Sequence, residues 1–206
     1  MAEPAYRFIS NEPDYRHLRD PERYRALYEE VGTVEANTHL KWREEWMKHF
    51  HPRPASLILE LGSHNGPNLV HYARLGHRLH GVELSSTLLA TCRRHVALEP
   101  PDVQARITLS QGWIEEYRPD PIYDHVLCTE VLEHVVDPTS ILRVAARGLK
   151  ADGSLYVTSP TSHWGNNTHV RGVPVAELEV WLADAGLVAT RAWSEDNRTF
   201  CHACRA

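Results

Sequence analysis

Short apolar runs alternate with segments of helical spacing from about residue 54 to the end of the chain. The apolar runs predict strands over residues 57–61, 78–83, 106–110, 123–129, 154–159, 187–193 and 199–205. Helical spacing predicts helices over residues 68–75, 86–95, 139–149 and 175–185. Strands that alternate with helices predict a parallel α/β sheet, and the last two strands, joined by a short polar turn, predict an antiparallel hairpin.

Turn and cap residues support these boundaries. Ser85 or Ser86 is the expected N-cap of the helix over 86–95, and Gly186 is expected to end the last long helix. Asp152 and Gly153 predict a turn that introduces the fifth strand.

Residues 1–53 differ from the rest, because charged and aromatic side chains there have helical spacing. Gly32 is expected to separate two helices, and the pairs Tyr24/Tyr28 and Trp42/Trp46 would each share a helix face. We therefore expect a helical cap or lid over residues 1–53. It would lie on one domain, residues 54–206, in which strands and helices alternate. The aromatic side chains either dock the cap on the domain or contact a substrate, and both roles can coexist.

Composition limits the class of protein. A chain of 206 residues suffices for one well-buried core. The net charge of -5 argues against a broad nucleic-acid surface and favours small, neutral or cationic partners. No apolar run is long enough to cross a bilayer, and the start lacks a basic-then-apolar leader, so we expect a cytoplasmic protein without a membrane partner.

The four cysteines are too few and too scattered in the sequence for a disulfide-stabilised fold. Cys92 and Cys128 are isolated, and Cys128 is expected to be a buried strand residue. Cys201 and Cys204 form a C-x-x-C, which suggests either a zinc or redox site or simply residues of a final strand. A second ligand pair for zinc is missing, so we favour the strand.

Two carboxylates flank the first two predicted strands. Glu60 lies at the end of the first strand, Gly62 and Gly66 follow in the turn, and Glu83 ends the second strand. In an open α/β sheet, ligands bind outside the carboxyl ends of the strands. Glu60 and Glu83 are therefore expected to face one crevice.

The glycine turn departs from the pattern of a dinucleotide site. His64 and Pro67 occupy positions where G-x-G-x-x-G sites have glycines that admit a pyrophosphate. An acidic residue before the turn also suits a positively charged ligand group. S-adenosylmethionine fits, because it carries an ammonium group, a sulfonium and a ribose diol and no phosphate.

From about Leu57 to Arg205 the chain resembles the class I S-adenosylmethionine-dependent methyltransferases. The resemblance rests on the glycine turn, on Glu83, on the segment 112–114 after the third strand, and on the run TEVLEHV over 129–135. It implies a Rossmann-like, mostly parallel sheet of seven strands with the last strand antiparallel and helices on both faces. The run over 129–135 resembles that of the ubiquinone-pathway O-methyltransferases.

The resemblance also implies a set of donor-binding residues. They are Lys41, Glu60, Gly62, Ser63, Gly66, Glu83, Leu84, Gly112, Trp113, Thr129 and Glu130. Trp113 replaces a usual acidic residue and either stacks on the adenine or packs in the core, with Gln111 or backbone carbonyls then reading the adenine amino group. Lys41 or Arg43 would clamp the donor carboxylate, unless they only form a solvated helix face.

The predicted catalytic residues follow the fourth strand. His134 is the candidate base, because imidazole titrates near neutral pH; the alternative is that it only holds the loop around Asp137 and Pro138. Methyl transfer is an in-line displacement, in which alignment and exclusion of water are the main tasks of the protein. His169 is the second candidate catalytic residue.

The same region resembles a metal site. Glu130, Glu133 and His134 have the spacing of one helical turn, as in the metal-binding run of ubiquinone-pathway and small-RNA terminal 2′-O-methyltransferases. His169 would complete the ligands, with His163 as a rival. Such ligands suit a divalent ion that binds an acceptor diol; alternatively, Glu130 only touches the donor and His134 only packs.

Several other histidines are expected to be surface or helix residues without a role in the site. These are His71, His77, His80 and His95.

A polar loop after the fifth strand is expected to form the acceptor pocket, together with the cap. Its candidate side chains are His163, Trp164, Asn166, Asn167, His169 and Arg171. No Asn-Pro-Pro-aromatic run is present, which argues against methylation of nucleic-acid bases. We expect methylation of an oxygen or nitrogen of a polar small molecule; alternatives are an RNA terminus, a protein side chain, or a catalytically idle ligand-binding subunit. The oligomeric state is left open.

Overall fold

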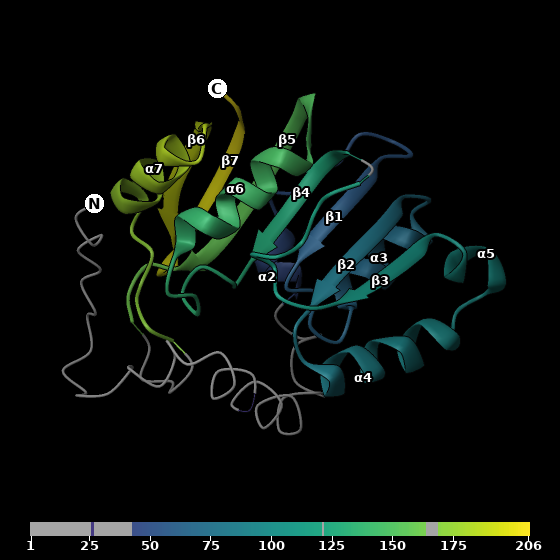
Figure 1. The fold of residues 1–206 in the computed structure, drawn as a ribbon. Coiled ribbons are helices and arrows are strands. Elements are labelled where there is room, and N and C mark those ends of the chain that lie inside the picture. The colour runs from purple at the N-terminus through teal and green to yellow at the C-terminus, as the bar shows by residue number, and fades with distance from the viewer. Residues whose placement is uncertain (1–25, 27–42, 121, 164–168) are drawn as a thin grey trace.

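A computed structural model describes residue 26 and residues 43–120, 122–163 and 169–206. The strands are β1 (Leu57–Leu61), β2 (Arg78–Glu83), β3 (Ile107–Gln111), β4 (Tyr123–Thr129), β5 (Leu149–Pro160), β6 (Leu187–Glu195) and β7 (Arg198–Arg205). They form one sheet in the order β3-β2-β1-β4-β5-β7-β6, in which β7 is antiparallel to both of its neighbours (Figure 1). This confirms the predicted sheet, with its C-terminal antiparallel strand.

Helices cover both faces of the sheet. They are α2 (Arg43–Met47), α3 (Pro67–Arg74), α4 (Ser86–Ala97), α5 (Pro101–Gln104), α6 (Pro138–Gly148) and α7 (Val175–Asp184). In Figure 1, α6 and α7 lie on the face of the sheet opposite to α3. Apolar side chains of α6 and α7 form one buried cluster with the sheet, and side chains of α3 and α4 belong to a second cluster. Within the described ranges, none of these helices has the length and apolar character needed to span a membrane.

Most element boundaries agree with the prediction to within two residues. Ser85 is the N-cap of α4, since its side chain accepts the Leu88 N–H at 3.2 Å. The β6–β7 turn is tighter than the predicted polar segment. Asp196 and Asn197 alone connect the strands, both with positive φ, as two-residue hairpin turns require.

The fifth strand differs from its prediction. Asp152 and Gly153 do not form a turn before β5; they lie inside it, where its register with β4 shifts between the pairs Tyr123/Leu149 and His125/Ser154. A Cβ at Gly153 would lie 3.0 Å from the backbone oxygen of Asp124, so the neighbouring chain approaches too closely for a side chain. The short helix α5 was also not predicted.

The predicted cap lies mostly outside the described residues, including Tyr24, Tyr28, Gly32, Lys41 and Trp42. Its last part, α2 and the residues after it, packs on the sheet. Met47 and Phe50 are buried in the same apolar cluster as α3. The Tyr156 hydroxyl donates to the Trp46 carbonyl at 2.9 Å, which fixes α2 beside β5.

The cysteines are free thiols in buried or half-buried positions. Cys128 is fully buried on β4, as predicted. Cys201 and Cys204 are both on β7, and their separation by three residues sends their side chains to opposite faces of the strand. The C-x-x-C is therefore part of a strand, as we favoured.

Two histidines contradict the prediction that they are surface or helix residues. His77 is buried, and its Nδ1 accepts the Ser56 N–H at 3.2 Å. His80 is half-buried on β2 and lies within hydrogen-bond distance of the Tyr123 hydroxyl and the Ser110 hydroxyl. Both replace water with partners on neighbouring segments, which the local sequence pattern does not show.

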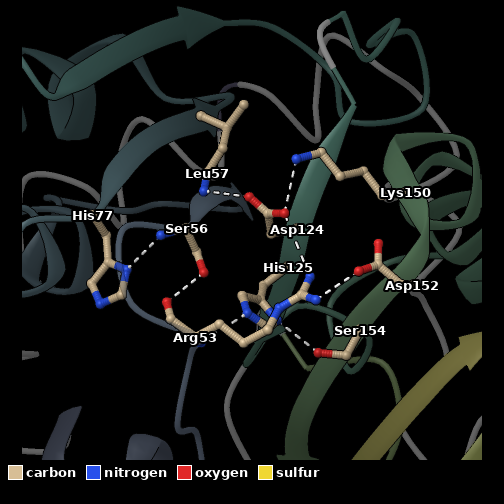
Figure 2. Close-up of polar contacts among 9 residues, drawn as sticks. All are labelled: Arg53, Ser56, Leu57, His77, Asp124, His125, Lys150, Asp152 and Ser154. Carbon is tan, nitrogen blue, oxygen red and sulfur yellow. Dashed lines mark hydrogen bonds and ion pairs between the residues drawn. The ribbon is translucent and has the colours of Figure 1, made fainter.

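A polar cluster closes the amino edge of the sheet, opposite the carboxyl ends (Figure 2). The Asp124 carboxylate accepts the Leu57 N–H and the Lys150 ammonium, each at 2.8 Å, and also pairs with Arg53. These bonds link the start of β1 and the segment before it to β4 and β5.

His125 is the second centre of this cluster. Its Nε2 accepts the Arg53 N–H at 3.2 Å, and its Nδ1 lies 2.7 Å from the Ser154 hydroxyl (Figure 2). Burial, and secondarily the nearby Arg53 charge, lowers the pKa of His125 from its ordinary 6.5 to about 4. The neutral ring is therefore the form that the fold requires.

We predict that His125 makes the fold acid-sensitive. A depressed pKa in the folded state contributes stability that is present above about pH 6.5 and is lost as pH falls toward 4. Urea unfolding of wild type and His125→Gln should therefore show a shallower loss of stability between these pH values in the variant, whose amide can replace both hydrogen bonds. Parallel pH curves for the two proteins would contradict the assignment.

Candidate active site

The turn between β1 and α3 is bonded to β2. The N–H groups of Gly62 and Ser63 both donate to the Val82 carbonyl, at 2.9 and 3.0 Å. Gly62, His64 and Gly66 all have positive φ, of 74°, 52° and 80°. The chain can therefore reverse direction directly at the carboxyl ends of β1 and β2.

Gly66 is required for a second reason, which is close packing. A Cβ at this position would lie 2.3 Å from the Cys92 sulfur on α4. Pro67 follows as the first residue of α3, where its missing N–H costs no helical hydrogen bond. Gly66 thus allows α3 to begin in contact with α4.

Glu83 receives two backbone hydrogen bonds at the end of β2. One carboxylate oxygen accepts the His64 N–H and the other accepts the Ser85 N–H, each at 2.8 Å, and the side chain is 5% exposed. Each carboxylate oxygen can accept a further bond, so two neighbouring hydroxyl groups could donate to Glu83 together. His64 contributes its backbone here, which explains how a histidine can replace the middle glycine.

Glu60 lies deeper in the same crevice. It is 2% exposed and accepts the Asn68 amide at 2.7 Å. Burial, together with the nearby Glu83 charge, raises its pKa to about 8, although the Asn68 hydrogen bond acts in the opposite direction. A cationic group bound beside Glu60 would favour its ionised form.

Three buried polar atoms in this crevice make no hydrogen bond among the described residues. They are Glu60 Oε2, Ser63 Oγ and Asn68 Oδ1. Buried polar atoms are normally satisfied, so such a group next to a glycine turn indicates a polar ligand with donors. An ammonium group has this chemistry.

The segment after β3 leaves space beside Glu83. The Gly112 N–H donates to the Glu83 carbonyl at 3.0 Å, and no atom lies within 4 Å of where a Cβ of Gly112 would be. Leu84 and Trp113 are half-buried here, while Ile114 packs against the main apolar cluster. Both predicted roles of Trp113 stay predictions.

The end of β4 is shaped by a left-handed residue. Glu130 has a φ of 55°, and its carboxylate accepts the Thr158 hydroxyl at 2.9 Å and pairs with Arg198. Burial raises the pKa of Glu130 to about 7, and the neighbouring Glu133 adds to this. Thr129, which precedes it, is buried.

Glu133, His134 and His169 converge on one point. Their candidate ligand atoms all lie within 4.8 Å of one another. The Ser159 hydroxyl donates to Glu133 at 2.5 Å, and the rings of His134 and His169 meet edge to face with centroids 4.5 Å apart. The Val170 N–H donates to the Glu133 carbonyl at 2.8 Å, which holds the segment with His169 beside the β4 turn.

Glu130, His163 and Arg171, which were also predicted for a metal site or pocket, do not belong to this group of three. The ring of His163 lies 2.8 Å from the His169 backbone oxygen. Arg171 is buried, donates to the Val136 carbonyl at 3.1 Å and packs over Trp181. Trp164, Asn166, Asn167 and Lys41 are outside the described residues.

Sequence reasoning missed several residues that contact the predicted ones. Asn68 and Ser159 were missed although each binds a predicted carboxylate. Arg198 was missed because only the antiparallel return of β7 brings it to the end of β4. Its position next to a two-residue hairpin turn was the one available signal.

Solved structures share this fold. The glycopeptide N-methyltransferase MtfA aligns with a TM-score of 0.66 at 17% identity, over 85% of this chain and 90% of that one. The mitomycin 7-O-methyltransferase MmcR aligns with a TM-score of 0.72 at 16% identity, over 93% of this chain and 60% of that one. The fold of this chain is therefore the one that these two methyltransferases share.

Sequence comparison agrees with this class. Residues 59–157 match the family model described as Methyltransferase domain. A ubiquinone biosynthesis O-methyltransferase from Hydrogenovibrio crunogenus is 25% identical over 70% of this chain and 67% of its own length. Another, from Albidiferax ferrireducens, is 30% identical over 57% of this chain and 46% of its own length.

The curated relatives are longer than the aligned part. The chain spans 67% of the length of the first of these relatives and 46% of the length of the second. The matched domain and the shared fold are both those of methyltransferases.

We predict that Gly66 is far less tolerant of a side chain than Gly76. Both have positive φ, but only Gly66 has an atom in the way. Gly76→Ala should cost about 1 kcal/mol of unfolding free energy from backbone strain, and Gly66→Ala about 3 kcal/mol from strain and overpacking. Urea unfolding measures both; Cys92→Ala should relieve part of the Gly66→Ala cost. Equal costs at the two glycines would show that the contact with Cys92 is not limiting.

Proposed function

We propose that this protein transfers a methyl group from S-adenosylmethionine to an oxygen or nitrogen of a polar small molecule. The observation that carries the proposal is a group of buried polar atoms at the carboxyl ends of β1 and β2. Glu60, Ser63 and Asn68 each have an atom without a hydrogen-bond partner among the described residues, and the Glu83 carboxylate accepts two backbone N–H groups there. The named relatives support it, since they include O- and N-methyltransferases of ubiquinone, mitomycin and glycopeptide chemistry. The cytoplasm remains the location that we expect.

The crevice residues fit the methyl donor. Glu60, with Ser63 and Asn68 beside it, would hold the ammonium group, and Glu83 would accept both ribose hydroxyl groups. Gly62 and Gly66 let the backbone approach the methionine part, and Leu84, Gly112 and Trp113 would border the adenine. When bound, the donor supplies an electrophilic methyl group on its sulfonium.

The acceptor is expected on the other side of the crevice, near His134 and His169. His134 is half-buried, lies 3.8 Å from the Glu133 carboxylate and can accept a proton from an acceptor hydroxyl. Glu133 is 1% exposed, so little water reaches its carboxylate. The charge of Glu133 would stabilise the imidazolium that results.

We further propose that Glu133, His134 and His169 hold a divalent ion; with the ion bound, His134 is a ligand, and the ion replaces it as the group that activates the acceptor hydroxyl. Their convergence within 4.8 Å and their mixed carboxylate and imidazole chemistry fit such an ion. A bound divalent ion would lower the pKa of an acceptor hydroxyl group. Glu130 and Thr129 would then border the donor instead of completing the metal site.

The first test concerns Glu83. Glu83→Gln should weaken S-adenosylmethionine binding roughly 10- to 100-fold, because an amide cannot accept the His64 and Ser85 N–H bonds and two hydroxyl donors together. Isothermal titration calorimetry measures the change, and thermal melting checks the fold. Glu99→Gln is the matched control, since Glu99 is also buried but pairs with Arg74.

Two calorimetric results would contradict the donor assignment. Tight binding of NAD without binding of S-adenosylmethionine would refute the proposed donor. Unchanged affinity in Glu83→Gln would show that the ribose is held elsewhere.

The second test concerns acceptor and metal together. Incubation with S-adenosylmethionine, Mn²⁺ and a pool of sugars, phenols, amines and RNA ends should add one methylene to a small molecule, read by mass spectrometry. His169→Ala should reduce the rate roughly 100-fold or more, while His51→Ala, at an exposed site, should not change it.

The outcomes separate the parts of this proposal. Methylation of RNA ends or of protein alone would refute the small-molecule acceptor. Full activity after chelation, with no bound metal by elemental analysis, would refute the metal site and leave the methyltransferase in place.

A further inference from the structure

The Glu130 carboxylate is turned toward β5 and β7, not toward the proposed metal ligands. Glu130 precedes Glu133 by three residues, and both are carboxylates at the same end of β4. Yet Glu133 joins His134 and His169, while Glu130 binds the Thr158 hydroxyl and the Arg198 guanidinium. A specific contact therefore decides which carboxylate faces the site.

Arg198 is held in place from several directions. It is the first residue of β7 and lies opposite Pro160 in the register with β5. The turn before it is fixed because the Asn197 carbonyl accepts both the N–H and the hydroxyl of Thr161, at 2.9 and 3.0 Å. Its guanidinium lies 5.4 Å from the centroid of the Trp46 ring, and its side chain is 17% exposed.

The same hairpin end is also bonded to the segment after α2. The Lys48 ammonium donates to the Glu195 carboxylate at 2.8 Å, and the His49 ring lies 3.1 Å from it. The end of the β6–β7 hairpin, residues 195–198, is thus anchored by contacts that do not involve Glu130. Glu130, which has a left-handed φ of 55°, pairs with Arg198 at this anchored end of the hairpin.

We propose that Arg198 is a positioning residue that withholds the Glu130 carboxylate from the group Glu133, His134 and His169. The inference rests on the proposed metal site and deepens it. Three protein ligands leave coordination positions open for acceptor oxygens, whereas a second carboxylate would fill one of them. Arg198 would in this way keep the site a catalytic one.

Electrostatics gives the expected effect of removing Arg198. A half-buried carboxylate that loses its cation keeps, within the described part of the chain, the Thr158 hydroxyl as its side-chain donor. A divalent ion at the neighbouring group is then the strongest compensating charge within reach of a side-chain rotation. Glu130 should therefore become an additional ligand in Arg198→Met.

Co²⁺ is a suitable probe, because its visible absorption reports the number and geometry of its ligands. Wild type should bind Co²⁺ and lose this binding in His169→Ala. Arg198→Met should bind about tenfold tighter, with a changed spectrum, since more carboxylate ligands raise affinity for a divalent ion. Arg198→Met combined with Glu130→Gln should return to the wild-type spectrum.

Three further variants serve as controls. Arg198→Lys should keep the wild-type spectrum, because the ammonium can still pair with Glu130. Arg191→Met removes an exposed arginine that packs over Trp193, and should also leave the spectrum unchanged. Glu130→Gln alone should leave it unchanged, and this variant tests the proposal even if Arg198→Met does not fold.

The failures of the two proposals can be distinguished. His169-dependent Co²⁺ binding with the same spectrum in wild type and folded Arg198→Met would overturn the role of Arg198 alone. A spectrum altered by Glu130→Gln in the wild-type background would overturn it too, since Glu130 would then already be a ligand. No Co²⁺ binding in any variant would overturn both the metal site and this inference.

Discussion

Two hydrogen bonds, from the His64 and Ser85 N–H groups to the Glu83 carboxylate, join the turn after β1 and the start of α4 to the end of β2, where we propose that the donor binds. They exist only because β1 and β2 run parallel in a register that pairs Leu61 with Val82, so that both strands end at one level. The turn after β1 must then bend back over β2, which requires the left-handed residues at 62, 64 and 66. The geometry of the proposed donor site is, in this view, a consequence of strand register.

The carboxyl edge of the sheet concentrates buried acidic groups. Glu60, Glu83 and Glu133 are each at most 5% exposed, and burial raises the pKa of Glu60 to about 8 and of Glu133 to about 7. Burying carboxylates costs stability unless cations or donors compensate them. A cationic donor on one side and a divalent ion on the other would both reduce that cost. The proposed ligands would therefore account for why the chain keeps these carboxylates buried.

Sequence pattern predicted this site as far as it depends on strand ends and local spacing. Glu60 and Glu83 could be placed together because parallel strands present their carboxyl ends at one edge. Arg198 and Ser159 could not, because their contacts arise from pairing of β5 with β7, which joins distant segments. The predictions for His77 and His80 were wrong for the same reason. The fifth strand was predicted too short, because Asp152 and Gly153 have the residue types of a turn but lie in β5 where its pairing with β4 is irregular.

The two edges of the sheet show a difference that points to function without reference to any relative. At the amino edge, Asp124 and His125 bind partners from the neighbouring segments, and the charges of Asp124 are matched by Lys150 and Arg53 (Figure 2). At the carboxyl edge, polar atoms of Glu60, Ser63 and Asn68 stay unsatisfied among the described residues. A fold that can satisfy buried polar groups at one edge has no stability reason to leave them open at the other. The open edge is therefore where a ligand contributes what the chain does not.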